Sequence, residues 1–215
     1  MINVNNFLEY CNFKNSVSQK KQDLLALYIF NEKRNGFFVE FGACDGIIFS
    51  NTFMLEADYG WHGILAEPAF VYQEDLIKNR SCHIDTNCVY SETGKKLVFN
   101  ECDASTLSTI LKYSDNDWAV EERKKGKHYE VNTISLDDLL KKYNAPRQID
   151  YMSIDTEGSE FDILNSFSFD WDIKLFTIEH NYTSMREEIF DLMSSRGYTR
   201  ILQEISAHDD WYVKE

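Results

Sequence analysis

Proline is scarce in this chain of 215 residues, which contains only 2 prolines beside 9 glycines. These numbers, with 43% hydrophobic and 27% charged residues, exclude collagen-like, low-complexity and disordered classes. No apolar run approaches the roughly 20 residues of a membrane-spanning helix. The N-terminus also lacks the basic segment and apolar stretch of a signal peptide. We therefore expect a soluble cytoplasmic protein with a single domain.

Basic residues are also few, because 22 Lys and Arg stand against 36 Asp and Glu, which gives a net charge of −14. Such a surface repels nucleic-acid phosphates and anionic lipids, so we expect neither nucleic acid nor a membrane as a partner. The five cysteines include no C-x-x-C pair, and their number is odd. Reduced thiols are therefore favoured over a disulfide framework or a zinc site.

Short apolar runs alternate with helical patterns over most of the chain. Strands are expected at 37–41, 63–67, 82–89, 149–155 and 175–180, with helices at 53–59, 71–79, 160–167 and 185–196. This alternation predicts an α/β fold built from right-handed βαβ units on a parallel sheet. Two final runs, 199–205 and 211–214, are joined by so short a link that they can only pair antiparallel.

Two segments do not follow this alternation. Apolar residues at helical spacing predict a helix from Gln19 to Arg34. We interpret residues 1–35 as a helical cap of the same domain as 36–215. Residues 100–131 form an insertion whose later part is dense in charge and lacks periodicity. We interpret it either as a solvated surface segment or as a lid over the active site.

The first expected strand ends in an acidic turn that contains two glycines. Gly42 and Gly46 let the backbone turn tightly and approach a ligand closely. The second strand ends at Glu67, about 20 residues after Gly46. A carboxylate at this spacing can accept hydrogen bonds from both ribose hydroxyls. Glu40 and Asp45 add negative charge, which opposes a pyrophosphate and favours a cationic ligand.

S-adenosylmethionine carries a sulfonium, an ammonium group and a ribose, so this turn favours it over NAD. The turn also lacks the middle glycine of the dinucleotide fingerprint G-x-G-x-x-G. A nicotinamide-dependent oxidoreductase is one alternative interpretation. A non-catalytic module that only binds S-adenosylmethionine is another.

Four segments resemble the FkbM-type methyltransferases: VEFGACDG from Val39, ILAEP from Ile64, YMSIDTEGSEFDIL from Tyr151 and HDDWYV from His208. The resemblance covers roughly residues 36–213, and the run D-x-E-G-x-E in the third segment is its most specific part. It implies a class I, Rossmann-like methyltransferase fold: a seven-stranded, mostly parallel sheet with an antiparallel last strand and helices on both faces. It also implies S-adenosylmethionine as methyl donor and a hydroxyl acceptor on a small molecule or glycan, with sugar-containing acceptors favoured.

The resemblance, carried over position by position, implies that the strand ends hold the cofactor. Glu40, Gly42 and Asp45 would line the methionine end, and Glu67 would bind the ribose. Cys88 would lie beside the adenine, unless it is simply a buried thiol. The expected cofactor-binding residues are Glu40, Phe41, Gly42, Ala43, Asp45, Gly46, Asn51, Glu67, Pro68, Asn87, Cys88 and Asp155.

An acceptor hydroxyl is a poor nucleophile until a base or a metal activates it. The candidate catalytic residues are Asp155 at the end of the fourth strand, Glu157 just after it, and His180 at the end of the fifth. Histidine is included because its ordinary pKa suits proton transfer near neutrality.

A divalent metal is the alternative means of activation. Asp155, Glu179, His180 and Asn181 could together bind Mg²⁺ or Mn²⁺, since oxygen and imidazole ligands suit these ions. Metal-dependent class I O-methyltransferases have Asp-Asn at the end of the fifth strand, whereas this chain has Glu-His-Asn. Both a base and a metal are therefore kept as interpretations.

Overall fold

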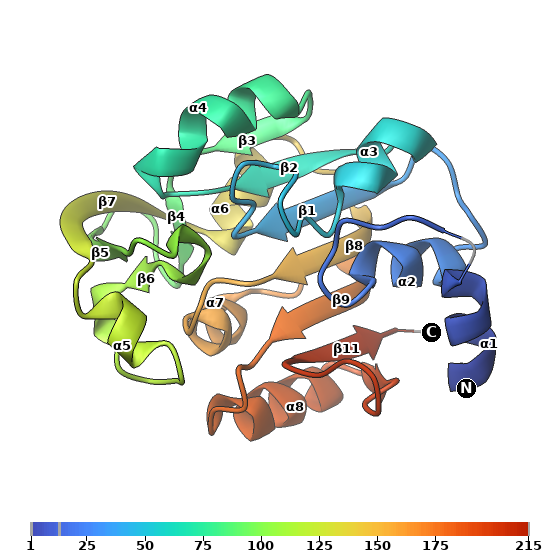
Figure 1. The fold of residues 1–215 in the computed structure, drawn as a ribbon. Coiled ribbons are helices and arrows are strands. Elements are labelled where there is room, and N and C mark those ends of the chain that lie inside the picture. The colour runs from blue at the N-terminus through green and yellow to red at the C-terminus, as the bar shows by residue number, and fades with distance from the viewer. Residues whose placement is uncertain (1, 13, 215) are drawn as a thin grey trace.

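The structure, a computed structural model, describes residues 2–12 and 14–214. Its centre is a seven-stranded sheet with the order β10-β11-β9-β8-β1-β2-β3 (Figure 1). The strands are β1 (Phe37–Phe41), β2 (His62–Ala66), β3 (His83–Asp85), β8 (Gln148–Ile154), β9 (Asp172–Glu179), β10 (Thr199–Ile201) and β11 (Asp209–Val213). β11 pairs antiparallel with β9 and β10, and the remaining neighbours pair parallel. The predicted α/β class with an antiparallel last strand is thereby confirmed.

Helices cover both faces of this sheet, because successive side chains of each strand point to opposite sides. The helices are α1 (Val4–Cys11), α2 (Gln22–Ile29), α3 (Phe53–Tyr59), α4 (Phe70–Asn79), α6 (Leu136–Lys142), α7 (Glu160–Ser166) and α8 (Met185–Ser195). Val39 and Phe41 of β1 join a core with α6, α7 and α8, whereas Phe38 joins a core with α1 to α4. Within the described residues, every helix is too short or too polar to cross a lipid bilayer.

The N-terminal cap contains two helices where the sequence pattern predicts one. α2 ends at Ile29, and the left-handed backbone of Asn31 and Glu32 prevents its continuation toward Arg34. α1 precedes it, and its Phe7 packs edge-to-face on Trp211 of β11, with ring centroids 6.2 Å apart. The two helices therefore cover one face of the sheet near its β11 end (Figure 1).

A second, four-stranded sheet occupies the region where an insertion is predicted. Its strands, in spatial order, are β4 (Cys88–Tyr90), β7 (Lys127–Ser135), β5 (Lys96–Glu101) and β6 (Thr109–Ile110). The prediction of a single strand at 82–89 is wrong. This segment contains two strands, β3 and β4, which belong to different sheets. The division follows from a turn in which Asn87 donates its backbone N–H to Asp85 Oδ1 (2.9 Å).

β5 does not form a hairpin with β4, which precedes it in the chain, but pairs antiparallel with β7. Residues 100–131 are thus largely ordered around this sheet and include the short helix α5 (Val120–Arg123). Tyr113 and Arg123 within this segment are buried. The segment forms a packed layer beside the ends of the large sheet, rather than a wholly solvated surface (Figure 1).

Candidate functional site

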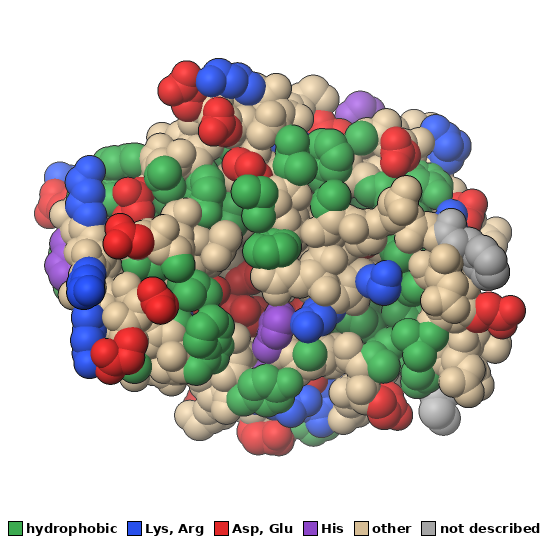
Figure 2. Space-filling model, in the orientation of Figure 1, with side chains coloured by type: hydrophobic (Ala, Val, Ile, Leu, Met, Phe, Trp, Pro, Cys, Tyr) green, Lys and Arg blue, Asp and Glu red, His purple; other side chains and the backbone are tan. Residues whose placement is uncertain are grey.

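A cavity lies at the carboxyl ends of β1, β2, β8 and β9, where open α/β sheets bind their ligands. The empty space in and around it, which includes open solvent, is about 910 Å³. The second sheet and residues 105–108 form the opposite wall, and Gln19 from the N-terminal cap also lines the cavity. Figure 2 shows a hollow on this face with acidic side chains at its floor.

The structure brings most of the predicted cofactor-binding residues to this cavity. Those that line it are Glu40, Phe41, Gly42, Asn51, Glu67, Pro68, Cys88 and Asp155. Ala43, Asp45, Gly46 and Asn87 do not line it. Asp45 instead accepts hydrogen bonds from the backbone N–H groups of Ile47 (2.9 Å) and Ile48 (2.7 Å), so its carboxylate closes the turn.

Glu67 follows β2 directly, and two backbone N–H groups hold its carboxylate. Its Oε2 accepts from the N–H of Cys44 (3.0 Å) and its Oε1 from the N–H of Ala69 (2.7 Å). Each carboxylate oxygen has two lone pairs, so each can accept one more hydrogen bond. Burial raises the pKa of Glu67 to about 7, although the two backbone donors oppose the shift.

Glu40 and Asn51 form the floor between β1 and α3. Glu40 Oε1 accepts from the backbone N–H of Asn51 (2.6 Å), and its Oε2 accepts from the hydroxyls of Ser50 and Thr52. Burial raises the pKa of Glu40, while Arg80 opposes the rise. Asn51 donates to Ser153 Oγ, but its buried Oδ1 has no hydrogen-bond partner within the described residues.

These groups fit S-adenosylmethionine. Asn51 Oδ1 offers an unused acceptor to an ammonium group, and Glu67 retains two acceptor positions for a ribose diol. The surrounding carboxylates favour a cationic ligand. The cofactor would therefore be held by Glu67 and Asn51, with the buried Cys88 of β4 in the wall of the cavity.

Gly42 joins the two strand ends that carry the site. Its φ is +72°, and a Cβ at this position would lie 1.9 Å from the backbone oxygen of Asp155. Only glycine allows the β1 turn and the end of β8 to approach this closely. The contact places Asp155 beside the floor of the cavity.

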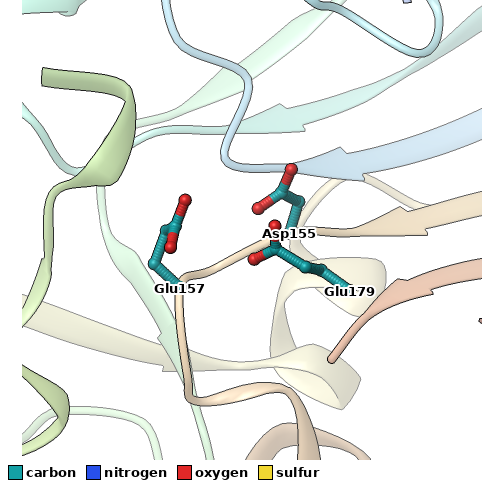
Figure 3. Close-up of side chains that lie close together, drawn as sticks. All are labelled: Asp155, Glu157 and Glu179. Carbon is teal, nitrogen blue, oxygen red and sulfur yellow. The ribbon is translucent and has the colours of Figure 1, made fainter. Parts of the chain in front are cut away.

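Three carboxylates meet at the end of the cavity formed by β8 and β9 (Figure 3). Asp155 follows β8, Glu157 lies in the loop before α7, and Glu179 ends β9. One oxygen from each lies within 4.8 Å of the others. We call Asp155, Glu157 and Glu179 the carboxylate cluster. Burial raises the pKa of all three side chains, that of Asp155 to about 7, and their mutual repulsion raises those of Glu157 and Glu179 further.

The backbone of Glu157 takes a left-handed conformation, with φ of 59°, that is costly for a residue with a side chain. Thr109 of β6 holds it there by donating its hydroxyl to the Glu157 carbonyl (2.8 Å). Glu160 fixes the same loop, because its Oε1 accepts from the backbone N–H of Thr156 (2.8 Å). Glu160 is therefore a structural part of the loop, as its place at the helix N-terminus suggests.

Arg123 is a residue of the site that sequence reasoning missed. Its side chain is fully buried, and it donates to Glu157 Oε2 (2.7 Å), Asp117 Oδ1 (2.9 Å) and the backbone oxygen of Leu107 (2.7 Å). It stands in the charged run EERKKGK, where nothing in the sequence distinguishes it from the neighbouring lysines. Its fork of donors allows it to pair with two carboxylates at once.

His180, expected at the active-site edge, lies outside the cavity. Its Nδ1 accepts from the backbone N–H of Tyr182 (3.0 Å), and its Nε2 lies 3.8 Å from Asp210 Oδ1. Burial lowers the pKa of His180 to about 4, so the ring is neutral at pH 7. The four metal ligands expected from the sequence are therefore not all brought together. Glu179 belongs to the carboxylate cluster with Asp155, whereas His180 faces β11. Asn181 donates its Nδ2 to Glu157 Oε2 (3.2 Å).

Comparisons with known proteins point to one family. The model of the methyltransferase FkbM domain matches residues 40–200, which is most of the chain. No curated protein matches the sequence. A precorrin-6y C5,15-methyltransferase from Geobacter metallireducens GS-15 is 8% identical, with a TM-score of 0.46 over 87% of this chain and 76% of that one. A ribosomal protein L11 methylase from Lactobacillus delbrueckii subsp. bulgaricus is 8% identical, with a TM-score of 0.43 over 90% of this chain and 78% of that one. The human methyltransferase 10 domain containing protein is 10% identical, with a TM-score of 0.41 over 99% of this chain and 83% of that one.

Proposed function

Because the chain belongs to the FkbM methyltransferase family, we propose that it is an O-methyltransferase that acts on a hydroxyl of a small molecule or glycan. The cofactor of this methyl transfer is S-adenosylmethionine. When bound, it supplies an electrophilic methyl group, whose transfer breaks the carbon–sulfur bond with the electron pair remaining on sulfur. The residues of the chain must bind the cofactor, align the acceptor oxygen and accept its proton.

The observation that carries the proposal is the position of Asp155 in the cavity that Glu67 also lines. A hydroxyl gives up a proton during methyl transfer, and a carboxylate is the group that can take it here. The pKa of Asp155, raised to about 7 by burial, suits a base that works near neutrality. We assign the proton to Asp155, with Glu157 and Glu179 beside it, because His180 does not line the cavity.

The cavity wall supports a hydroxylated acceptor. Ser105, Thr106 and Ser108 line the side opposite the sheet, and their hydroxyls can exchange hydrogen bonds with an acceptor that carries several of its own. Phe49, also in the lining, is half exposed and offers an apolar surface to a sugar ring. The net charge of −14 opposes nucleic acid and anionic lipid as partners. We therefore favour a sugar-containing acceptor.

Release of S-adenosylhomocysteine, measured over a panel of sugars, sugar nucleotides and hydroxylated small molecules, tests this proposal. With an active acceptor, Asp155→Asn should lower kcat by about 10²- to 10⁴-fold, as expected for loss of a general base. His180→Asn is the matched variant and should lose far less. A loss in His180→Asn equal to that in Asp155→Asn would contradict the assignment of the proton to Asp155.

The non-catalytic alternative makes the opposite prediction for the same assay. A binding module would retain S-adenosylhomocysteine in calorimetry and yet turn over no acceptor of the panel. The nicotinamide-dependent alternative predicts binding of NAD or NADP instead, and the family match speaks against it.

A further inference from the structure

The carboxylate cluster holds more negative charge than the surrounding residues neutralise. Arg123 pairs with Glu157 (2.7 Å), but it also pairs with Asp117 (2.9 Å). Within residues 2–12 and 14–214, no lysine or arginine forms an ion pair with Asp155 or Glu179. Buried carboxylates without a partner are costly, so such a group either binds a proton or meets a cation from outside.

Glu179 provides an independent sign of a missing partner. It is only 7% exposed, and its Oε2 has no hydrogen-bond partner within the described part of the chain. In Figure 3 its carboxylate turns toward the space between Asp155 and Glu157. Buried polar atoms are almost always satisfied, so an unpaired oxygen aimed into this space suggests a ligand there.

From these contacts we infer that the carboxylate cluster binds one divalent cation of the Mg²⁺ or Mn²⁺ type. Such ions prefer oxygen ligands at about 2.0–2.2 Å, which places opposite ligands of an octahedron roughly 4.2 Å apart. The three carboxylate oxygens lie within 4.8 Å of one another, so small side-chain rotations bring them to this spacing. This set differs from the sequence-based one, because Glu157 takes the place of His180 and Asn181.

The surroundings keep the three ligands in place. Asn181 and Arg123 both donate to Glu157 Oε2, and such partners of a ligand fix its orientation. Gly42 holds the end of β8 beside the turn after β1, which positions Asp155. All three carboxylates line the cavity, so the remaining coordination positions face the space open to an acceptor.

The cation would then bind the acceptor hydroxyl and lower the pKa of its proton. The proton would still pass from the hydroxyl oxygen to Asp155, at the carboxylate oxygen that does not bind the cation, and the hydroxyl oxygen would keep the electron pair that forms the bond to the methyl carbon. This role in activation rests on the proposed function, whereas binding of the cation does not.

Mn²⁺ binding, followed by the loss of the electron paramagnetic resonance signal of free Mn²⁺, tests the inference. The full chain is titrated with and without S-adenosylhomocysteine. We expect one Mn²⁺ per chain, with a Kd of about 1 mM or below, as for oxygen-ligand sites of modest affinity. Glu179→Gln keeps the size of the side chain and should weaken Mn²⁺ binding at least about tenfold.

Glu67→Gln is the matched control, because it lies in the same cavity but outside the cluster. It should retain Mn²⁺ and bind S-adenosylhomocysteine more weakly than wild type, whereas Glu179→Gln should bind Mn²⁺ more weakly and retain its affinity for S-adenosylhomocysteine. Asp155→Asn replaces Glu179→Gln if circular dichroism shows that the latter does not fold. Absence of Mn²⁺ binding to the wild-type chain in both titrations, or equal binding to the folded cluster variant, would overturn the inference. A wild-type chain that binds Mn²⁺ but not S-adenosylhomocysteine would instead count against the proposed function.

Discussion

Lowering the pH from 8 to 6 should weaken S-adenosylhomocysteine binding about tenfold through Glu67 alone. With a pKa of about 7, this carboxyl is about nine-tenths ionised at pH 8 and about one-tenth ionised at pH 6. Only the ionised form accepts from two ribose hydroxyls while it also accepts from the N–H groups of Cys44 and Ala69. Calorimetric titration of wild type and Glu67→Gln at both pH values separates Glu67 from the other carboxyls of the cavity. The wild-type affinity should fall about tenfold more than that of the variant, and parallel curves would refute the role of Glu67.

The same pKa has the opposite consequence for the chain without ligand. Folding raises the pKa of Glu67 from 4.5 to about 7, so its protonated form is favoured in the folded state. Its stabilising contribution is fully present below pH 4.5 and is lost as the pH rises through 7. Between pH 5 and pH 8 this loss is about 2.5 kcal/mol. In urea titrations, the difference in the free energy of unfolding between wild type and Glu67→Gln should therefore change with pH. A difference that stays constant from pH 5 to pH 8 would contradict the raised pKa of Glu67.

Two further substitutions test how the site is held together. Arg123→Met leaves Glu157 and Asp117 without their shared cation, so the free energy of unfolding should fall by about 3–5 kcal/mol in urea titrations. Gly42→Ala places a Cβ 1.9 Å from a backbone oxygen and should cost about 3 kcal/mol or more, whereas Gly94→Ala, with a similar φ of +82° and nothing within 4 Å, should cost only about 1–2 kcal/mol. Equal losses in the two glycine variants, measured by thermal unfolding, would show that the contact at Gly42 is unimportant.

The large sheet could be predicted from the sequence because its strands are short, continuous apolar runs. The run Phe37–Phe41 is buried on both faces of the sheet, and such strands differ in composition from the amphipathic helices between them. The second sheet could not be predicted in this way. β5 pairs with β7, about 30 residues later, and no local pattern specifies which of two distant strands will be neighbours. Residues 82–89 are also predicted as one strand, although an Asx turn at Asp85 divides them.

The candidate site was predictable where a residue type follows directly from its place on a strand. Glu67 and Asp155 each come directly after a parallel strand, and the ends of parallel strands share one edge of the sheet. The choice between Glu179 and His180 was less accessible. Glu179 is the last residue of β9 and lines the cavity, whereas His180 follows it and lies near Asp210. A shift of one residue in the expected strand end exchanges the two positions. Arg123 depends on tertiary contacts with the loop before α7, for which the sequence carries no signal.

The distribution of charge in the cavity has a different effect on the cofactor and on its product. Glu40, Asp155 and Glu179 line the cavity, and the field of their ionised forms favours a ligand with a sulfonium over one with a neutral thioether. S-adenosylhomocysteine lacks the sulfonium, so it keeps the ribose contact of Glu67 but loses most of this attraction. The affinity for the product should therefore depend mainly on the ionisation of Glu67. The affinity for the cofactor should depend on the ionisation of both Glu67 and Asp155. Without added divalent cation, a steeper pH dependence for S-adenosylmethionine than for S-adenosylhomocysteine follows, since both carboxyls have a pKa of about 7.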